Sequence, residues 1–319
     1  MNRRFALLVL AFTAAQVFAA EYPAKPVRII APFPPGGSVD LIARLVANDL
    51  AKPLGQQIVV DNRAGASGMI GTELAKNAAP DGYTLLVNTL PFVTNHLVYD
   101  KASYDPINDF APISLLCSVA SVLVAHPSLP VNSMKELIVL ARSKPNAIAY
   151  GTAGAATNPH IAGELLNNLA KIKLFAVHYK GGGPATIATL SGETQLYFVN
   201  AIPEALPHIQ AKRLKALGIT ATKRNSIAPQ IPTMAEAGVP GYEFVTWQIL
   251  AAPKATPAPI IAMLNEKVRA VLNTPDAVKR WQDRGFDVIA STPEEMTAHL
   301  NREIKKWRAV FKEQGIKAE

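Results

Sequence analysis

Four short loops carry the residues that could do chemistry, and all four are rich in glycine, proline and small polar side chains. The loops are Pro32-Phe-Pro-Pro-Gly-Gly-Ser-Val-Asp40, Asn62-Arg-Ala-Gly-Ala-Ser-Gly68, Gly151-Thr-Ala-Gly-Ala-Ala-Thr-Asn-Pro-His160 and Lys180-Gly-Gly-Gly-Pro184. Each precedes a predicted helix, where the first N–H groups have no intrahelical partner, and glycine lets the backbone approach a ligand closely. Helix N-termini of this kind bind anions such as carboxylates. One such loop is more often a simple tight turn, but four of them favour a shared anion site.

The motifs of common enzymes are missing from the sequence. It contains no G-x-x-x-x-G-K-[ST], G-x-G-x-x-G, G-x-S-x-G or H-E-x-x-H pattern, and its six histidines show no metal-ligand spacing. Cys117 is the only cysteine, which excludes an internal disulfide and a cysteine-cluster metal site. We therefore expect no catalytic residue, no metal and no cofactor. An exported hydrolase with Ser38 or Ser67 as nucleophile is kept as an alternative.

The composition indicates a globular protein of about two domains, since 319 residues exceed a domain of roughly 150 residues. Hydrophobic residues make up 49% of the chain and charged residues 18%, which supports sizeable cores and argues against general disorder. The net charge of +8 comes from scattered lysines and arginines, without a dense basic stripe interleaved with aromatic residues. We therefore expect no nucleic-acid partner.

The first residues have the three-part pattern of a secretory signal peptide. Arg3 and Arg4 are followed by the apolar stretch 5–16, and residues 17–19 are compact ones of the kind that precede a cleavage site. The apolar stretch is too short to cross a bilayer comfortably as a permanent helix. We therefore expect residues 1–19 to be removed and the protein to be periplasmic.

Between the loops, short β-branched runs alternate with amphipathic stretches. The runs that predict strands are 27–30, 57–60, 84–87, 121–125, 148–150, 174–177, 195–199, 214–220 and 244–250. The stretches that predict helices are 38–50, 70–76, 133–142, 159–171, 184–190, 260–272, 276–285 and 293–314. This alternation predicts an α/β fold with parallel sheets. Pro159 and Pro184 suit the first helical position, which predicts Asn158 and Gly183 as helix caps.

A set of motifs extends over nearly the whole mature chain. They are Tyr22-Pro-Ala-Lys-Pro26, Pro35-Gly-Gly-Ser-Val-Asp40, Asn62-Arg-Ala-Gly-Ala-Ser-Gly68, Pro80-Asp-Gly-Tyr-Thr84, Tyr179-Lys-Gly-Gly-Gly-Pro184, Pro232-Thr-Met-Ala-Glu-Ala-Gly238 and Ala252-Pro-Lys-Ala-Thr-Pro257. In this order and spacing the motifs resemble the Bug family, the extracytoplasmic solute-binding receptors of tripartite tricarboxylate transporters.

The resemblance implies a two-lobed Venus-flytrap fold in which the chain crosses twice between the lobes. We place the crossings near Ser118–Ser121 and Thr246–Ala251. Lobe 1 then comprises residues 20–119 and 248–319, and lobe 2 comprises residues 120–247. The first lobe is therefore predicted to be discontinuous in sequence.

The resemblance also implies the residues that grip the ligand, mostly through main-chain amides and small hydroxyl groups. Those expected from lobe 1 are Gly37, Ser38, Asp40, Ala66, Ser67 and Thr89. Those expected from lobe 2 are Thr157, Asn158, Gly182 and Asn200. Within this set Asp40 is expected to brace its loop, and the hydroxyls of Ser38, Ser67 and Thr157 are expected to bind the carboxylate.

The predicted function is that of a periplasmic solute-binding protein, not an enzyme. It would capture a small organic carboxylate between its lobes and deliver it to the membrane permease subunits of a tripartite tricarboxylate transporter. The alternative from another class is an extracytoplasmic sensor that presents its ligand to a membrane signalling system, because the same loops would serve both roles.

Overall fold

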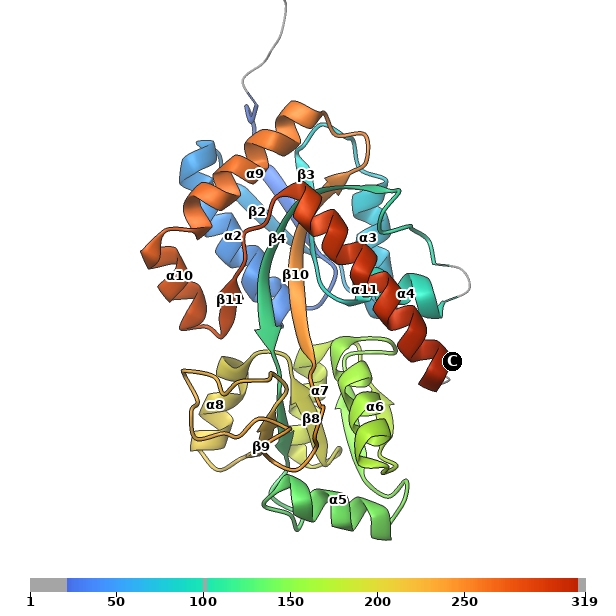
Figure 1. The fold of residues 1–319 in the computed structure, drawn as a ribbon. Coiled ribbons are helices and arrows are strands. Elements are labelled where there is room, and N and C mark those ends of the chain that lie inside the picture. Colours follow the sequence, from blue (N-terminus) through green and yellow to red (C-terminus); the bar gives the residue numbers. More distant parts are fainter. Residues whose placement is uncertain (1–21, 100–101, 315–319) are drawn as a thin grey trace, which may run out of the picture.

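The computed structural model describes residues 22–99 and 102–314, which form two β-sheets with helices packed against them (Figure 1). The six-stranded sheet lies in the upper half of the figure and the five-stranded sheet in the lower half. Two long strands, β4 (Phe110–Ala120) and β10 (Val245–Pro253), lie side by side in opposite directions and extend to the junction of the two halves. The predicted two-lobed α/β fold is confirmed. The predicted signal peptide at 1–19 lies outside the described residues.

The six-stranded sheet forms the centre of the first lobe. Besides β4 and β10 it contains β1 (Val27–Ala31), β2 (Ile58–Asn62), β3 (Thr84–Asn88) and β11 (Phe286–Val288). The strand order is β11-β4-β10-β3-β1-β2. Strands β2, β1 and β3 are parallel, whereas β10 is antiparallel to both β3 and β4, and β11 is antiparallel to β4.

The five-stranded sheet forms the centre of the second lobe. Its strands are β5 (Val122–Ala125), β6 (Ala149–Thr152), β7 (Phe175–His178), β8 (Leu196–Val199) and β9 (Lys215–Ile219). Their order is β7-β6-β8-β5-β9, in which β7, β6 and β8 are parallel and β5 is antiparallel to β8 and β9.

The prediction of parallel sheets is right for three neighbouring strands in each lobe and wrong for the strands beside them. The reason is the path of the chain between the lobes. Strand β4 carries the chain out of the first lobe and β10 brings it back, so the two run in opposite directions. Strand β5 starts opposite the end of β8, at Val122↔Val199, and therefore runs away from the other lobe.

Helices cover the two sheets. Those of the first lobe are α2 (Ser38–Leu54), η1 (Ala66–Gly68), α3 (Met69–Lys76), α4 (Pro91–Val98), α9 (Ala258–Leu272), α10 (Pro275–Gln282) and α11 (Pro293–Gln314). Those of the second lobe are α5 (Met134–Ser143), α6 (Asn158–Ala170), α7 (Gly182–Ser191) and α8 (Ile202–Gln210). The eight predicted helices are all present, with ends shifted by a few residues.

Three helices or strands that position the site were not predicted, and each has a physical reason. Helix α4 buries Pro91–Asn95 on all sides, so it lacks the amphipathic period that marks a surface helix. Helix α8 has Pro207 in its interior, where proline normally argues against a helix. Strand β4 has 11 residues, but Pro112 and two serines interrupt its apolar run. The sequence pattern therefore did not predict it as a strand.

The two crossings lie next to each other and are tied together by one residue. The first consists of Ser121 alone, between β4 and β5, and the second leads from β9 back to β10. The Oγ1 atom of Thr220 accepts a hydrogen bond from the Ser121 amide at 2.8 Å, and the Thr220 carbonyl accepts one from Phe244 at 2.9 Å. Strands of the first sheet come from residues 27–120 and 245–288, and those of the second from 122–219. The lobe boundaries themselves stay predictions.

The three tryptophans belong to the core. Trp247, Trp281 and Trp307 are all buried. The indole N–H groups of Trp247 and Trp307 both donate to one Oε2 atom of Glu303, at 3.0 and 2.9 Å. Helix α11 is thereby fixed to β10.

Candidate ligand-binding site

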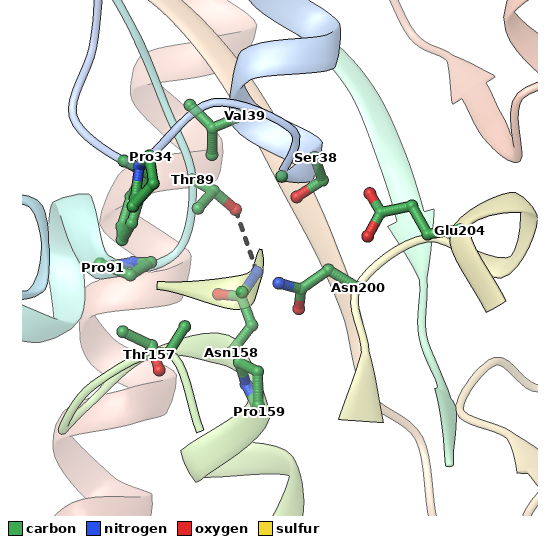
Figure 2. Close-up of a pocket in the computed structure, with 14 residues that line it drawn as sticks. Pro34, Ser38, Val39, Thr89, Pro91, Thr157, Asn158, Pro159, Asn200 and Glu204 are labelled. Carbon is green, nitrogen blue, oxygen red and sulfur yellow. Dashed lines mark hydrogen bonds between the residues drawn. The ribbon is translucent and has the colours of Figure 1, made fainter. Parts of the chain in front are cut away.

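A pocket lies between the two lobes (Figure 2). Its walls from the first lobe are Phe33, Pro34, Gly37, Ser38, Val39, Thr89 and Pro91. Its walls from the second lobe are Ala153, Thr157, Asn158, Pro159, Gly182, Asn200 and Glu204. Seven of the ten predicted site residues are among them, and Asp40, Ala66 and Ser67 are not.

The first lobe presents the start of helix α2 to the pocket. Gly37 is the N-cap residue in an extended conformation, and no side chain caps the helix. The first bond within the helix runs from the Leu41 amide to the Gly37 carbonyl at 3.0 Å. The amides of Ser38, Val39 and Asp40 therefore have no intrahelical acceptor. Since Ser38 and Val39 line the pocket, the positive end of the α2 dipole faces it.

Asp40 supports this loop from behind. Its carboxylate accepts hydrogen bonds from the Gly36 amide and from Asn62 Nδ2, both at 3.0 Å, and pairs with Arg44 at 3.0 Å. Burial raises the pKa of Asp40, but the bonds from Arg44, Gly36 and Asn62 outweigh burial and hold the pKa below its usual value. Asp40 is therefore placed to brace the loop rather than to touch a ligand.

The second lobe presents the starts of α6 and α7, and both begin earlier than predicted. The cap of α6 is Thr157 rather than Asn158, and the cap of α7 is Gly181 rather than Gly183. In α6 the proline Pro159 occupies the second helical position, which is equally compatible with its missing N–H. Neither helix has a side-chain cap. Their first amides, at Asn158 and Gly182, are therefore available on the pocket wall.

The hydroxyl groups are used differently from the prediction. Thr157 Oγ1 donates to the Gly154 carbonyl at 2.6 Å, and Ser67 Oγ donates to the Ala155 carbonyl at 2.8 Å. A hydroxyl has one proton, so in this structure neither Thr157 nor Ser67 offers a donor to a carboxylate. Thr89 Oγ1 likewise donates to the Trp247 carbonyl at 2.7 Å. The donors that remain on the pocket wall are main-chain amides, the Ser38 hydroxyl and the side-chain amides of Asn158 and Asn200.

Ala66 and Ser67 join the lobes beside the pocket rather than inside it. Both have positive φ angles, 47° and 53°, which non-glycine residues adopt at a cost in free energy. The Ser67 side chain reaches Ala155 of the other lobe, and Thr94 Oγ1 similarly donates to the Ala156 carbonyl at 2.9 Å. Ala66, Ser67 and Lys180 line a neighbouring cavity.

A buried histidine holds the second-lobe loop in shape. His160 Nδ1 accepts a hydrogen bond from the Ala156 amide at 3.0 Å, where Ala156 has a φ of 57°. The ring packs edge-on against His178, with 4.9 Å between centroids. Burial first, and then the neighbouring His178, lowers the pKa of His160 to about 4. His160 is therefore neutral at neutral pH and acts as a hydrogen-bond acceptor.

This arrangement predicts a loss of stability in mild acid. Because the folded-state pKa is about 4 and the usual value is 6.5, the unfolded chain binds the proton first as the pH falls. His160 therefore contributes stability above pH 6.5 that is lost progressively toward pH 4, by about 3 kcal/mol at most. Urea unfolding between pH 7 and pH 4.5 measures this loss of stability.

His160→Gln, which can accept a hydrogen bond but cannot titrate, should lose less stability over that range than the wild type. His126→Gln, in a turn away from the site, is the matched control. Parallel profiles for wild type and His160→Gln would contradict the assignment.

Glu204 is a wall residue that the sequence analysis did not identify. It lies in the first turn of α8, and Figure 2 shows its carboxyl group pointing into the pocket toward Ser38. Its Oε1 atom is closed to solvent and has no hydrogen-bond partner in the part of the chain that the structure describes. Burial raises its pKa to about 8. One feature of the sequence could have identified it. Glu204 directly follows Pro203, a residue that suits a helix start, and lies four residues after the predicted site residue Asn200.

Within residues 22–99 and 102–314, no three His, Cys, Asp or Glu side chains are grouped so as to hold a metal ion. Nor does any helix in these ranges have the length and apolar character needed to cross a membrane.

Comparison with known proteins places these features in context. The sequence model of the protein family described as "Tripartite tricarboxylate transporter family receptor" matches residues 42–316. Protein BugT of Bordetella pertussis is 35% identical to the chain over 306 residues, which cover 95% of this chain and 94% of BugT.

Two solved structures from Rhodopseudomonas palustris are also similar. Rpa4515 with adipate has a TM-score of 0.90 at 35% identity, covering 94% of this chain and 100% of that chain. MatC with bound malate has a TM-score of 0.84 at 32% identity, covering 91% of this chain and 99% of that chain. Both similar structures therefore hold a small dicarboxylate.

Proposed function

The chain belongs to the family of tripartite tricarboxylate transporter receptors, which includes the Bug proteins, and from this we propose that it captures a small organic carboxylate in the periplasm. The family consists of periplasmic solute-binding receptors rather than enzymes. We propose that the pocket between the lobes is the binding site, and that the loaded protein delivers its ligand to membrane permease subunits.

The observation that carries this proposal is the convergence of three uncapped helix starts on one pocket. Helices α2, α6 and α7 each contribute wall residues from their first turn, namely Ser38, Asn158 and Gly182. Free first-turn amides and helix dipoles favour a negative charge at this point. Among the described residues, no lysine or arginine lines the pocket. The carboxylate is therefore bound by amides rather than by an ion pair.

The two ligand-bound relatives support a carboxylate as the ligand. Rpa4515 was solved with adipate and MatC with malate, and the proposed site requires an anionic group of the same kind. We also propose that the protein performs no chemistry on its ligand. No histidine, lysine or cysteine among the described pocket residues is placed to activate Ser38.

The test is calorimetric titration with adipate, malate and citrate, after unfolding and refolding the protein to remove any co-purified ligand. At least one of the three should bind, and thermal stabilisation should follow RT ln(1 + [L]/Kd). Adipamide, which has the length of adipate without its charges, is the matched control and should not bind. Equal binding of adipate and adipamide, or no response to any carboxylate in a wider panel, would contradict the proposal.

A further inference from the structure

Glu204 is unusual because it places an acidic group in a pocket that otherwise suits an anion. It is the only acidic residue among the described pocket residues, and no basic residue accompanies it there. The Oε1 atom of Glu204 is closed to solvent and has no hydrogen-bond partner among the described residues. An ionised carboxylate in that setting is unfavourable, so the group takes up a proton instead. Burial raises the pKa of Glu204 to about 8, which agrees with this reasoning.

Among the described residues, burial is the only influence on the pKa of Glu204, and no cation opposes it. On β8 the titratable neighbour is Tyr197, which is fully buried and whose own pKa is raised by burial and by Glu204. On α2 the nearest acid, Asp40, is directed at Gly36 and Asn62.

The turn between α10 and β11 approaches α8 on the remaining side. A Cβ atom on Gly285 would lie 2.7 Å from Pro203. The charged residues that flank Gly285 are directed elsewhere: Arg284 donates to the Arg280 carbonyl, and Asp287 lies beside Cys117. Among the described residues, no cation is therefore placed to neutralise an ionised Glu204.

We propose that protonated Glu204 donates a hydrogen bond to the second carboxylate of a dicarboxylate ligand, and thereby selects dicarboxylates over monocarboxylates. The inference rests on the proposed function. One end of the ligand would be bound by the amides at the starts of α2, α6 and α7. The other end would meet Glu204, whose unpartnered Oε1 atom is closed to solvent at the pocket wall. An O–H···O⁻ bond of this kind is among the stronger hydrogen bonds in proteins.

Two consequences separate this role from a structural one. The first is selectivity, because adipate should bind more tightly than hexanoate, which has the same chain length and one carboxylate. The second is pH dependence, because only the protonated form of Glu204 can donate. With a pKa of about 8, affinity for adipate should be about 30-fold weaker at pH 9.5 than at pH 7. Both carboxylates of adipate stay ionised over this range.

The experiment is calorimetric titration of the full protein with adipate and hexanoate from pH 6 to pH 9.5. In Glu204→Gln, which can donate but cannot ionise, the decline of adipate affinity at high pH should disappear. In Glu204→Leu, which cannot donate, the preference for adipate over hexanoate should fall by about tenfold or more. Glu243→Gln, an exposed change of the same type, should keep the wild-type profile.

The outcomes distinguish the inference from the function on which it rests. If adipate binds with an affinity that is flat to pH 9.5, or if Glu204→Leu keeps the preference for adipate, the role of Glu204 is refuted and the proposed function stands. If affinity rises with pH through Glu204, the ionised group pairs with a ligand cation and the dicarboxylate inference is wrong. If no carboxylate binds at any pH, the proposed function itself fails, and this inference with it.

Discussion

Gly181→Ala is expected to weaken carboxylate binding by about 10- to 150-fold, because a single methyl group there prevents the lobes from closing. A Cβ atom on Gly181 would lie 2.6 Å from Cδ and 2.7 Å from Cγ of Pro34. Gly181 precedes α7 in the second lobe, and Pro34 precedes α2 in the first. A proline ring cannot rotate away, so the two loops must separate, and the amides of Ser38 and Gly182 can no longer reach one ligand.

The size of this effect follows from the hydrogen bonds that are lost. One hydrogen bond to a charged group is worth about 1.5–3 kcal/mol, and about 1.4 kcal/mol is a factor of ten in affinity. Calorimetry with the carboxylate that binds the wild type most tightly measures the change. Small-angle scattering at saturating ligand should show a larger radius of gyration for Gly181→Ala than for the wild type.

Two glycines provide matched controls for the Gly181 variant. Gly181 has a φ of +127°, so alanine there is also strained. Gly241 has a φ of +77° with no atom within 4 Å of its Cβ position. Gly241→Ala therefore has the backbone strain without a steric clash. Gly183 has open space and no positive φ. Both controls should bind ligand as the wild type does. If Gly181→Ala binds the ligand as well as Gly241→Ala does, a clash with Pro34 does not keep the lobes apart.

The second large effect is expected from Ser38→Pro, which removes a main-chain amide from the pocket. Ser38 is the first residue of α2, a position where proline fits well. Gly37 before it has φ −89° and ψ 170°, a conformation allowed before proline. The fold should therefore tolerate the change, with an unaltered melting temperature in the absence of ligand.

Ser38→Ala separates the two groups that Ser38→Pro removes. The alanine variant loses the hydroxyl alone, and the proline variant loses the hydroxyl and the N–H. The further loss from alanine to proline should be about tenfold or more in calorimetric affinity. If both variants bind equally well, the α2 amide does not hold the carboxylate, and the amide grip is wrong at this helix.

The loops around the pocket could be predicted from the sequence because their pattern is local. Glycines and small residues followed by an amphipathic run mark a helix start, and seven of the ten predicted residues do line the pocket. The roles of Thr157 and Ser67 could not be predicted in the same way. Their hydroxyls donate to Gly154 and Ala155, and these partners are set by the folding of the loop and by the contact between the lobes.

Glu204 and the strand directions depend on tertiary structure that sequence patterns do not carry. Helix α8 holds Pro207 in its interior, so proline rules argued against the helix that aims Glu204 at the pocket. The antiparallel pairing of β4 with β10 follows from the two crossings, because a strand that leaves a lobe and a strand that returns to it must run in opposite directions. The hydrophobic periodicity of a single strand cannot distinguish an antiparallel pairing from a parallel one.

A crystal structure of the protein with the tightest-binding dicarboxylate tests the central claim most directly. One carboxylate should lie about 2.7–2.9 Å from the amide nitrogen of Ser38 or Val39, and equally close to that of Asn158 or Gly182. No lysine or arginine should contact that carboxylate. A ligand held by Lys180 in the neighbouring cavity, or bound outside the junction of the lobes, would contradict the account.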